Sequence, residues 1–415
     1  MTIRLCLFDL DNTLIRTNDL EDFRGAGNVR NTSAVYTRGL IAAFSGAELS
    51  SRLLYSRERL MHLRRSHPRM KWGVFTRSPR HYADTLLAQA YPGLAWDVVV
   101  AYEDVRNTKP HPDGVHLASR ALGNIPVEEI ALVGDEKVDV VTAYRAGCWA
   151  FIDKASWEAP YTYEQWWALE RVPDAVFRGP DELSDLLAEP ALGLPELEYL
   201  IEGRELPHRR SRIDKINRLF QRPWSGNVPV RVLGRLFGEY QEISGRRSRH
   251  VLTDQIIAHK DADIFPDEWA KCVMACVRRL APFPPGAIVT VIPFKPDRKP
   301  RLERFLAHVE VLYQPPVRRG VISVAPEYTF IPDLLAFRPG VVSNHANHLT
   351  AQERFANVGD HLFVKRPHDV RGKRVIVLDD VVTSGATLLW AHRYLSEAGA
   401  SEVTCLALAQ AIGAT

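Results

Sequence analysis

Two aspartates one residue apart, Asp9 and Asp11, end the first apolar run of the chain in the segment LFDLDNTLIR, residues 7–16. Ionised carboxylates at the end of a buried strand cost folding energy unless something binds them, because burial removes their hydration. A carboxylate can accept a phosphoryl group as an aspartyl-phosphate, and a second carboxylate can act as general acid and base. The pair is therefore a candidate for phosphoryl transfer, provided that the chain supplies suitable partners.

Three later segments place reactive polar residues after apolar runs. Thr76 lies in GVFTRS, Lys109 in RNTKPHPD, and Asp135 and Asp139 in VGDEKVD. Ligands of open parallel sheets bind beyond the carboxyl ends of the strands. We therefore expect these side chains to gather with the first two aspartates at one edge of a sheet.

This ordered set resembles the haloacid dehalogenase (HAD) superfamily, whose motifs are DxDxT, a strand ending in Thr or Ser, a Lys, and GDxxxD. The resemblance implies an Mg²⁺-dependent phosphatase with Asp9 as nucleophile and Asp11 as acid and base. It also implies that Thr76 donates to the phosphate and that Lys109 offsets the negative charge. The implied metal ligands, all oxygen donors, are Asp9, Asp11 through its backbone carbonyl, Asp135 and Asp139.

A second candidate site lies at residues 375–387, which read VIVLDDVVTSGAT. A strand ends in Asp379 and Asp380, and a short loop with hydroxyl side chains leads into a helix over 386–400. The backbone N–H groups of such a loop, together with the helix N-terminus, bind a terminal phosphate well. The two carboxylates are placed to accept hydrogen bonds from ribose hydroxyls.

The second motif resembles the type I phosphoribosyltransferase signature, which binds phosphoribosyl diphosphate (PRPP). The segments 253–263 and 348–365 look like the ComF branch of that family, and the similarity covers residues 230–412. The resemblance implies that Asp379 and Asp380 contact the ribose diol. The implied 5′-phosphate site consists of Thr383, Ser384, Gly385, Ala386 and Thr387.

One segment departs from the ComF pattern. After the strand expected at 287–294, the chain lacks the usual Gly-Phe-Asn-Gln helix but keeps four basic residues, Lys295, Arg298, Arg301 and Arg304. We expect Lys295 and Arg298 to bind pyrophosphate. The sequence leaves open which molecule accepts the phosphoribosyl group. The nearby polar side chains either contact the acceptor or only form loop hydrogen bonds; they are Asn344, His345, Asn347 and His348.

The expected fold class is α/β, with two Rossmann-like parallel-sheet domains. Strands are expected at 3–9, 72–76, 97–101, 130–134, 148–152, 175–177, 287–294 and 373–380, with helices at 80–90 and 112–122 between some of them. A HAD-type domain is predicted over 1–190, with a helical cap insert at 14–71. Residues 191–212, rich in Pro, Gly and charge, are the expected linker to a ComF-like domain over 213–415.

Composition favours a globular protein of two domains, with 415 residues and 46% apolar residues. Five scattered cysteines indicate buried thiols in a reducing compartment. Aspartates interrupt the first apolar run too early for a signal peptide, and no apolar stretch is long enough to span a membrane. We expect a cytoplasmic protein of unknown oligomeric state.

Three functions are compatible with these motifs. The first is a bifunctional enzyme acting on nucleotide or sugar-phosphate metabolites. The second is a phosphatase for nucleic-acid ends, because residues 52–71 hold seven Arg or Lys against one acidic residue. Against it, the leucines of this segment predict an ordinary amphipathic helix with a solvated basic face. The third is a phosphatase regulated by a non-catalytic PRPP sensor.

Overall fold

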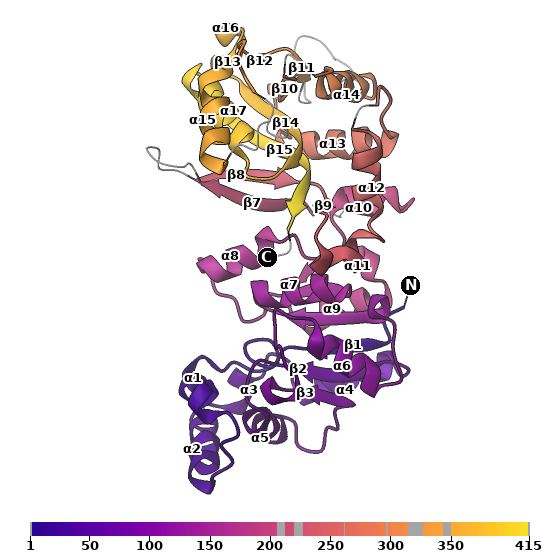
Figure 1. Cartoon of the computed structure of the whole chain (residues 1–415), viewed down its shortest axis with the longest axis vertical. Helices are drawn as coiled ribbons and strands as arrows, with labels where there is room; N and C mark the ends of the chain where they lie inside the picture. The colour runs from indigo at the N-terminus through magenta and orange to yellow at the C-terminus, as the bar shows by residue number, and fades with distance from the viewer. Residues whose placement is uncertain are drawn as a thin grey trace. The chain divides into compact units, whose positions relative to one another are not determined.

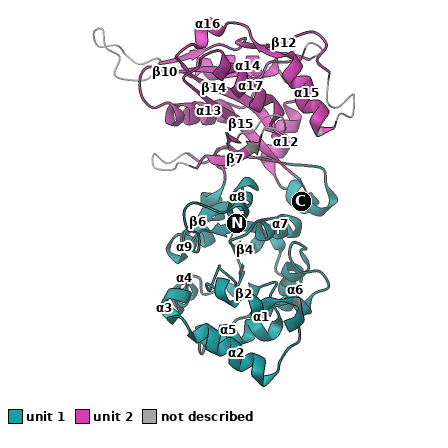
Figure 2. Ribbon diagram, turned by 90° about the vertical axis from the view of Figure 1, so that its left-hand side faces the viewer, with its two compact units in different colours: residues 1–194, 237–249, 413–415 teal, residues 195–236, 250–412 magenta. Residues whose placement is uncertain are grey.

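The computed structural model describes residues 2–205, 212–219, 227–260, 262–295, 298–313, 327–342 and 350–413 (Figure 1). The chain forms two compact units, coloured separately in Figure 2. Unit 1 comprises residues 1–194, 237–249 and 413–415, and unit 2 comprises residues 195–236 and 250–412. The division into an independent domain at 1–190, a linker and a domain at 213–415 stays a prediction.

Unit 1 is built on a six-stranded sheet in the order β3-β2-β1-β4-β5-β6, and all neighbouring strands are parallel. This is the doubly wound order, in which the strand sequence reverses beside β1. The six predicted strands are confirmed to within two residues at each end. Their bounds are β1 Leu5–Phe8, β2 Lys71–Phe75, β3 Val98–Val100, β4 Ile130–Gly134, β5 Trp149–Asp153 and β6 Ala175–Phe177.

Helices cover both faces of this sheet (Figure 2). Each crossover returns the chain to the amino end of the next strand, so every strand is parallel to its neighbours. The crossover helices after β2 are α5 Arg80–Ala90, α6 Asp113–Ala121, α7 Lys137–Ala146 and α8 Tyr163–Glu170, and α9 Pro180–Ala188 follows the last strand, β6. The segment between β1 and β2 holds α1 Glu21–Arg24, α2 Ala34–Ser45, α3 Leu49–Arg52 and α4 Arg57–Ser66.

Helix α4 packs its apolar stripe into the core of unit 1. Leu60 and Leu63 are each 1% exposed, as the helical spacing of the leucines predicts. Three basic side chains of the segment 52–71 form ion pairs within the unit: Arg52 with Asp19 at 2.7 Å, the exposed Arg59 with Asp181 at 2.6 Å, and Lys71 with Asp97 at 3.1 Å. These contacts favour the amphipathic-helix interpretation over a polyanion clamp.

Residues 237–249 return to unit 1 from the second half of the sequence. They include α11, Ser244–Arg247. The guanidinium of Arg246 lies 6.0 Å, 5.4 Å and 5.8 Å from the ring centroids of Tyr144, Trp149 and Phe237. It also forms an ion pair with Asp174, which is fully buried. An arginine stacked on aromatic rings and paired with a buried carboxylate fixes this segment in place.

Unit 2 has a seven-stranded sheet in the order β11-β10-β14-β15-β8-β7, with β9 paired to β15. Pairs along the order from β11 to β8 are parallel, whereas β7 is antiparallel to β8, so the sheet is mixed. The strands predicted at 287–294 and 373–380 are β10 and β14. The bounds are β7 Asp214–Leu219, β8 Asn227–Val232, β9 Arg235–Phe237, β10 Gly286–Val291, β11 Glu327–Phe330, β14 Arg374–Val382 and β15 Glu402–Ile412.

The helices and the small hairpin complete unit 2. Strands β12 Leu335–Phe337 and β13 Leu362–Val364 pair antiparallel. The helices are α10 Glu196–Ile201, α12 Val251–Ala258, α13 Asp267–Leu280, α14 Arg301–Val311, α15 Ala351–His361, α16 Pro367–Val370 and α17 Ala386–Glu397. Across the described residues, none of the helices has the length and apolar character needed to cross a bilayer.

A buried ionic network ties α10 to the rest of unit 2. Glu198 on α10 accepts hydrogen bonds from the Arg235 backbone N–H at 2.8 Å and from its Nε at 2.9 Å. His250 Nε2 lies 3.1 Å from the same carboxylate. Burial alone would raise the pKa of Glu198, but Arg235 and His250 hold it well below its usual value. Helix α10, within the expected linker region, is therefore anchored to unit 2.

Candidate active sites

The predicted residues of the first site lie at the carboxyl ends of neighbouring strands. Asp9 follows β1, Thr76 follows β2, and Asp135 follows β4. The Asp9 backbone N–H donates to the Val133 carbonyl at 2.8 Å, which fixes the loop at the end of β1 against β4. A cavity of about 320 Å³ opens here; its lining residues include Asp9, Asp11, Asn12, Glu21, Arg24, Thr76, Arg77, Ser78, Glu136 and Asp139.

Lys109 joins two of the carboxylates. Its Nζ donates to Asp9 Oδ1 at 2.6 Å and to Asp139 Oδ1 at 2.7 Å, and the residue is 4% exposed. Burial alone would lower the pKa of Lys109, but the Asp139 and Asp9 carboxylates raise it above its usual value. The lysine therefore stays charged and holds the two carboxylates together, and its part in offsetting the charge of the phosphate stays a prediction.

The ring of Phe75 supports Lys109 from below, with its centroid 5.0 Å from Nζ. This ring lies against α6 where the helix has Gly114. A Cβ atom at Gly114 would lie 2.3 Å from the Phe75 ring, which is closer than real Cβ contacts occur. The glycine thus creates the space in which the Phe75 ring lies under the ammonium group.

The GDxxxD segment positions Asp135 and Asp139. Thr13 Oγ1 donates to Asp135 Oδ1 at 2.9 Å, and the backbone N–H of Glu136 donates to Asp139 Oδ2 at 3.1 Å. A Cβ atom at Gly134 would lie 2.2 Å from Asp139 Cγ. Only glycine at this position lets the Asp139 carboxylate fold back over the strand end and reach Lys109.

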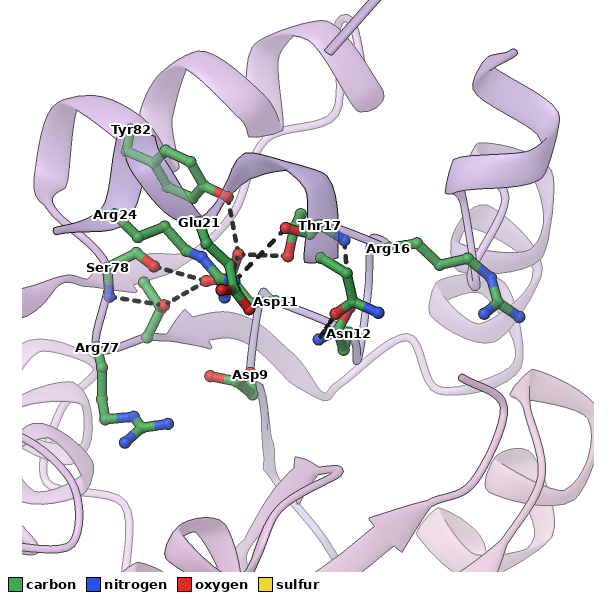
Figure 3. A network of polar contacts seen from close by, with 12 residues as sticks. Asp9, Asp11, Asn12, Arg16, Thr17, Glu21, Arg24, Arg77, Ser78 and Tyr82 are labelled. Atoms are coloured by element: carbon green, nitrogen blue, oxygen red, sulfur yellow. Dashed lines mark hydrogen bonds and ion pairs between the residues drawn. The ribbon is translucent and has the colours of Figure 1, made fainter. Parts of the chain in front are cut away.

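Asp11 is the centre of a separate polar network (Figure 3). Thr17 Oγ1 donates to its Oδ1 at 2.7 Å, Tyr82 OH donates to Oδ1 at 2.9 Å, and Ser78 Oγ donates to Oδ2 at 2.6 Å. Arg24 Nη1, from α1, lies 3.5 Å from Oδ1. These four partners fix the Asp11 side chain beside the cavity.

Sequence reasoning missed all four of these partners. None belongs to a HAD motif, and in the sequence each is an ordinary hydroxyl, phenol or guanidinium group. Ser78 offers the one local signal, because it lies two residues after Thr76 in the same strand-end loop. Its backbone N–H donates to Thr76 Oγ1 at 3.0 Å, and Thr76 Oγ1 lies 3.4 Å from Asp11 Oδ2.

The charge of the site fits a divalent cation. The pKa of Asp9 is raised to about 7, chiefly by burial; Lys109 lowers it in part, and the Asp139 and Asp11 carboxylates add to the rise. Burial, together with repulsion from Asp9 and Asp139, also raises the pKa of Asp135 well above its usual value. Carboxylates that are buried and mutually repulsive favour binding of a hard cation, which prefers oxygen ligands.

No three His, Cys, Asp or Glu side chains form a metal-binding group in the part of the chain that the structure describes. The predicted set needs only two side-chain carboxylates, Asp9 and Asp135, with a backbone carbonyl at Asp11. Asp139 is hydrogen-bonded to Lys109 and Glu136. Its predicted contact with the metal or its waters stays a prediction, as do the other ligands.

The second site is formed by the end of β14, the loop after it and the start of α17. Gly385 caps α17 with a φ of 77°, a left-handed conformation that glycine adopts without strain. Thr383 and Ser384 are exposed in the loop, and Thr387 lies in the first turn of the helix. The loop hydroxyls and the N-terminus of a 12-residue helix can together bind a phosphate.

A cavity of about 270 Å³ lies beside Asp379 and Asp380. The pKa of Asp379 is raised to about 7 by burial, even though Arg301 lowers it in part. The predicted pyrophosphate residues Lys295 and Arg298 line this cavity. Arg301 and Arg304, the other two basic residues noted in this segment of the sequence, also line it, together with Lys260 and Lys299, which were not singled out from the sequence. The four polar residues at 344, 345, 347 and 348 lie outside the described residues.

Comparisons with known proteins identify two segments of the chain. Residues 55–152 match the family described as haloacid dehalogenase-like hydrolase, and residues 335–414 match the phosphoribosyl transferase domain. The phosphoglycolate phosphatase of Salmonella typhimurium LT2 is 35% identical over 123 residues, 30% of this chain and 44% of the relative. The phosphoglycolate phosphatase of Escherichia coli K12 is 33% identical over 127 residues, 30% of this chain and 46% of the relative.

The chain thus spans less than half of the length of these curated relatives. Among solved structures, a haloacid dehalogenase-like hydrolase from Bacteroides fragilis is 22% identical and covers 44% of this chain and 99% of its own, with a TM-score of 0.31. CbbY from Rhodobacter sphaeroides, solved in complex with phosphate, is 20% identical and covers 36% of this chain and 86% of its own, with a TM-score of 0.30.

Proposed function

Because the chain contains a haloacid dehalogenase-like hydrolase segment and a phosphoribosyl transferase segment, we propose that it is a bifunctional enzyme. One activity is an Mg²⁺-dependent phosphomonoester hydrolase, and the other is a PRPP-dependent phosphoribosyltransferase of the ComF type. The observation that carries the first activity is Lys109, which joins the candidate nucleophile Asp9 to Asp139. Few purely structural roles account for a buried lysine that joins two carboxylates lining a cavity.

In the proposed hydrolase reaction, the Asp9 carboxylate attacks phosphorus and forms an aspartyl-phosphate. The bond from phosphorus to the leaving oxygen breaks, and Asp11 gives its proton to that oxygen. Asp11 then takes a proton from water, which attacks phosphorus, restores Asp9 and releases inorganic phosphate. Mg²⁺, when bound by the oxygen ligands, neutralises charge on the transferring phosphoryl group. Lys109 and Thr76 hold the nucleophile and the phosphate in place.

In the proposed transferase reaction, the loop at 383–387 holds the 5′-phosphate of PRPP and the carboxylates of Asp379 and Asp380 hold the ribose diol. An acceptor attacks C1 of the ribose while the bond from C1 to the diphosphate breaks. The basic residues of the 270 Å³ cavity, including Lys295 and Arg298, stabilise the departing pyrophosphate.

The substrates are small phosphate esters, in keeping with the curated relatives, which are named phosphoglycolate phosphatases. We favour consecutive steps, in which the transferase forms a nucleotide-like product and the hydrolase removes its 5′-phosphate. The five cysteines are buried thiols, which favours a reducing compartment, the cytoplasm.

The test is to assay the full chain with PRPP, Mg²⁺ and a panel of nucleobases for release of pyrophosphate and of phosphate. Asp9→Asn should abolish phosphate release and leave PRPP binding unchanged. Asp379→Ala combined with Asp380→Ala should abolish PRPP binding and leave phosphate release from a generic phosphomonoester unchanged. If neither pyrophosphate nor phosphate appears with the unaltered chain, the bifunctional proposal is wrong.

A PRPP sensor is the second candidate, and one contact favours it. Arg301 forms an ion pair with Asp380, one of the two carboxylates proposed to hold the ribose. PRPP binding without pyrophosphate release, together with a change in the phosphatase rate, would establish a sensor. Pyrophosphate release on turnover would exclude it.

A further inference from the structure

Both carboxylate oxygens of Asp380 have partners within unit 2. Oδ1 accepts a hydrogen bond from the Val381 backbone N–H at 2.7 Å, and Oδ2 forms an ion pair with Arg301. A ribose diol can bind Asp380 only by donating its hydroxyl protons to these same oxygens. Each oxygen accepts about two hydrogen bonds, so the diol must share Oδ2 with Arg301 or displace it, and a neutral hydroxyl is a weaker partner for a carboxylate than a guanidinium.

Phosphate oxygens bound in the adjacent cavity are an alternative partner for Arg301. It is the first residue of α14, and it lines the 270 Å³ cavity together with the other basic residues, Lys260, Lys295, Arg298, Lys299 and Arg304. The Arg301 and Asp380 side chains are 20% and 28% exposed, so ligands can reach both. A diphosphate carries several negative charges. A guanidinium binds two phosphate oxygens with the same forked pair of N–H groups that it uses to bind a carboxylate.

We propose that Arg301 couples the two halves of the PRPP site: a diphosphate draws Arg301 away from Asp380, and the released carboxylate then accepts the ribose hydroxyls. This inference rests on the proposed transferase function. Arg301 is thus a specificity-determining residue, because a ribose phosphate without a diphosphate at C1 must displace the guanidinium unaided. Binding at one subsite strengthens binding at the other, and linkage requires the effect to be reciprocal.

The experiment measures the dissociation constants of ribose 5-phosphate and of inorganic pyrophosphate by calorimetry, each alone and with the other at saturation. The full chain is used at one fixed Mg²⁺ concentration. We expect saturating pyrophosphate to tighten ribose 5-phosphate binding by about tenfold, within the usual range of coupling between sites. In Arg301→Ala, ribose 5-phosphate alone should bind about as tightly as it does to the unaltered chain saturated with pyrophosphate, and the coupling should vanish.

Arg304→Ala is the matched control. Arg304 lies on the same helix and lines the same cavity, but its ion-pair partner is Asp263. This variant should weaken pyrophosphate binding while it keeps the coupling. If Arg301→Ala fails to fold, as judged by circular dichroism, Arg301→Gln replaces it, because glutamine keeps much of the side-chain length without the charge.

The outcomes separate this inference from the function on which it rests. If the unaltered chain does not bind PRPP, the transferase proposal fails. If PRPP binds but the coupling is absent, or is the same in the Arg301 and Arg304 variants, only the inference about Arg301 is overturned. Weaker ribose 5-phosphate binding in Arg301→Ala would likewise overturn it, since Arg301 would then assist the ribose rather than compete with it.

Discussion

Replacing Lys109 by methionine removes the charge that joins two carboxylates in unit 1. The Lys109 side chain is 1% exposed and bonds to Asp9 and Asp139 at 2.6 Å and 2.7 Å. Methionine fills much of the volume of the lysine stem, so the main loss is electrostatic. Removing one partner of a buried ion pair costs about 3–5 kcal/mol, because the remaining charge is left without compensation. We expect Lys109→Met to lower the free energy of unfolding of unit 1 by that amount.

Lys71→Met is the matched control, with the same substitution in the same unit. Lys71 pairs with Asp97 at 3.1 Å, but its side chain is 49% exposed. An exposed pair contributes only about 0.2–1 kcal/mol, because water and salt screen it. The contrast between the two variants therefore isolates burial as the cause of the larger effect.

The assay is thermal and urea unfolding of the full chain in the presence of a chelator, so that no metal ion substitutes for the lost ammonium group. A loss of 3–5 kcal/mol corresponds to a fall of roughly 6–20 °C in the melting temperature of a unit of this size. Lys109→Met should also abolish phosphate release. If the two variants unfold within about 1 kcal/mol of each other, Lys109 does not hold the buried carboxylates as described.

Three further variants test other contacts. Glu198→Gln should destabilise unit 2 at neutral pH, as measured by urea unfolding. The difference in free energy of unfolding between this variant and the unaltered chain should shrink as pH falls below 4.5, because the pKa of Glu198 lies below that usual value in the folded chain. An unchanged difference down to pH 3 would contradict this reading. Gly134→Ala should lower the melting temperature measured by calorimetry, because the new Cβ would collide with Asp139. If the melting temperature is unchanged, the loop adapts to the extra atom. Ser78→Ala should slow phosphate release about tenfold, because it removes the hydrogen bond from Ser78 Oγ to the Asp11 carboxylate. An unchanged rate of phosphate release would contradict this expectation.

The sequence predicted the elements whose signals are local. The run IALVG at 130–134 is bounded by a polar segment and by Gly134-Asp135, and β4 has the same bounds. Lys109 was singled out by its order among the motifs, and the structure brings it to Asp9 and Asp139. The roles of these residues in catalysis stay predictions.

The features that the sequence did not reveal depend on contacts between distant segments. Arg246 looks like one more arginine in a basic stretch, and only the folded chain places it against Tyr144, Trp149 and Phe237. The antiparallel edge strand β7 belongs to a charged segment without a strong period, so no alternation predicted it. Tyr82 reaches Asp11 only because α5 begins beside the carboxyl end of β1.

The return of residues 237–249 to unit 1 has a consequence for how the two proposed activities are inherited. A simple end-to-end gene fusion keeps each fold in one continuous stretch, but this chain leaves unit 1 after Leu194 and comes back for Arg246. A stop codon anywhere between those points would remove the guanidinium that neutralises the buried Asp174. Loss of the second half of the gene would therefore damage unit 1, and with it the proposed hydrolase, as well. The proposed hydrolase cannot be moved to another protein as a cassette that ends at the linker.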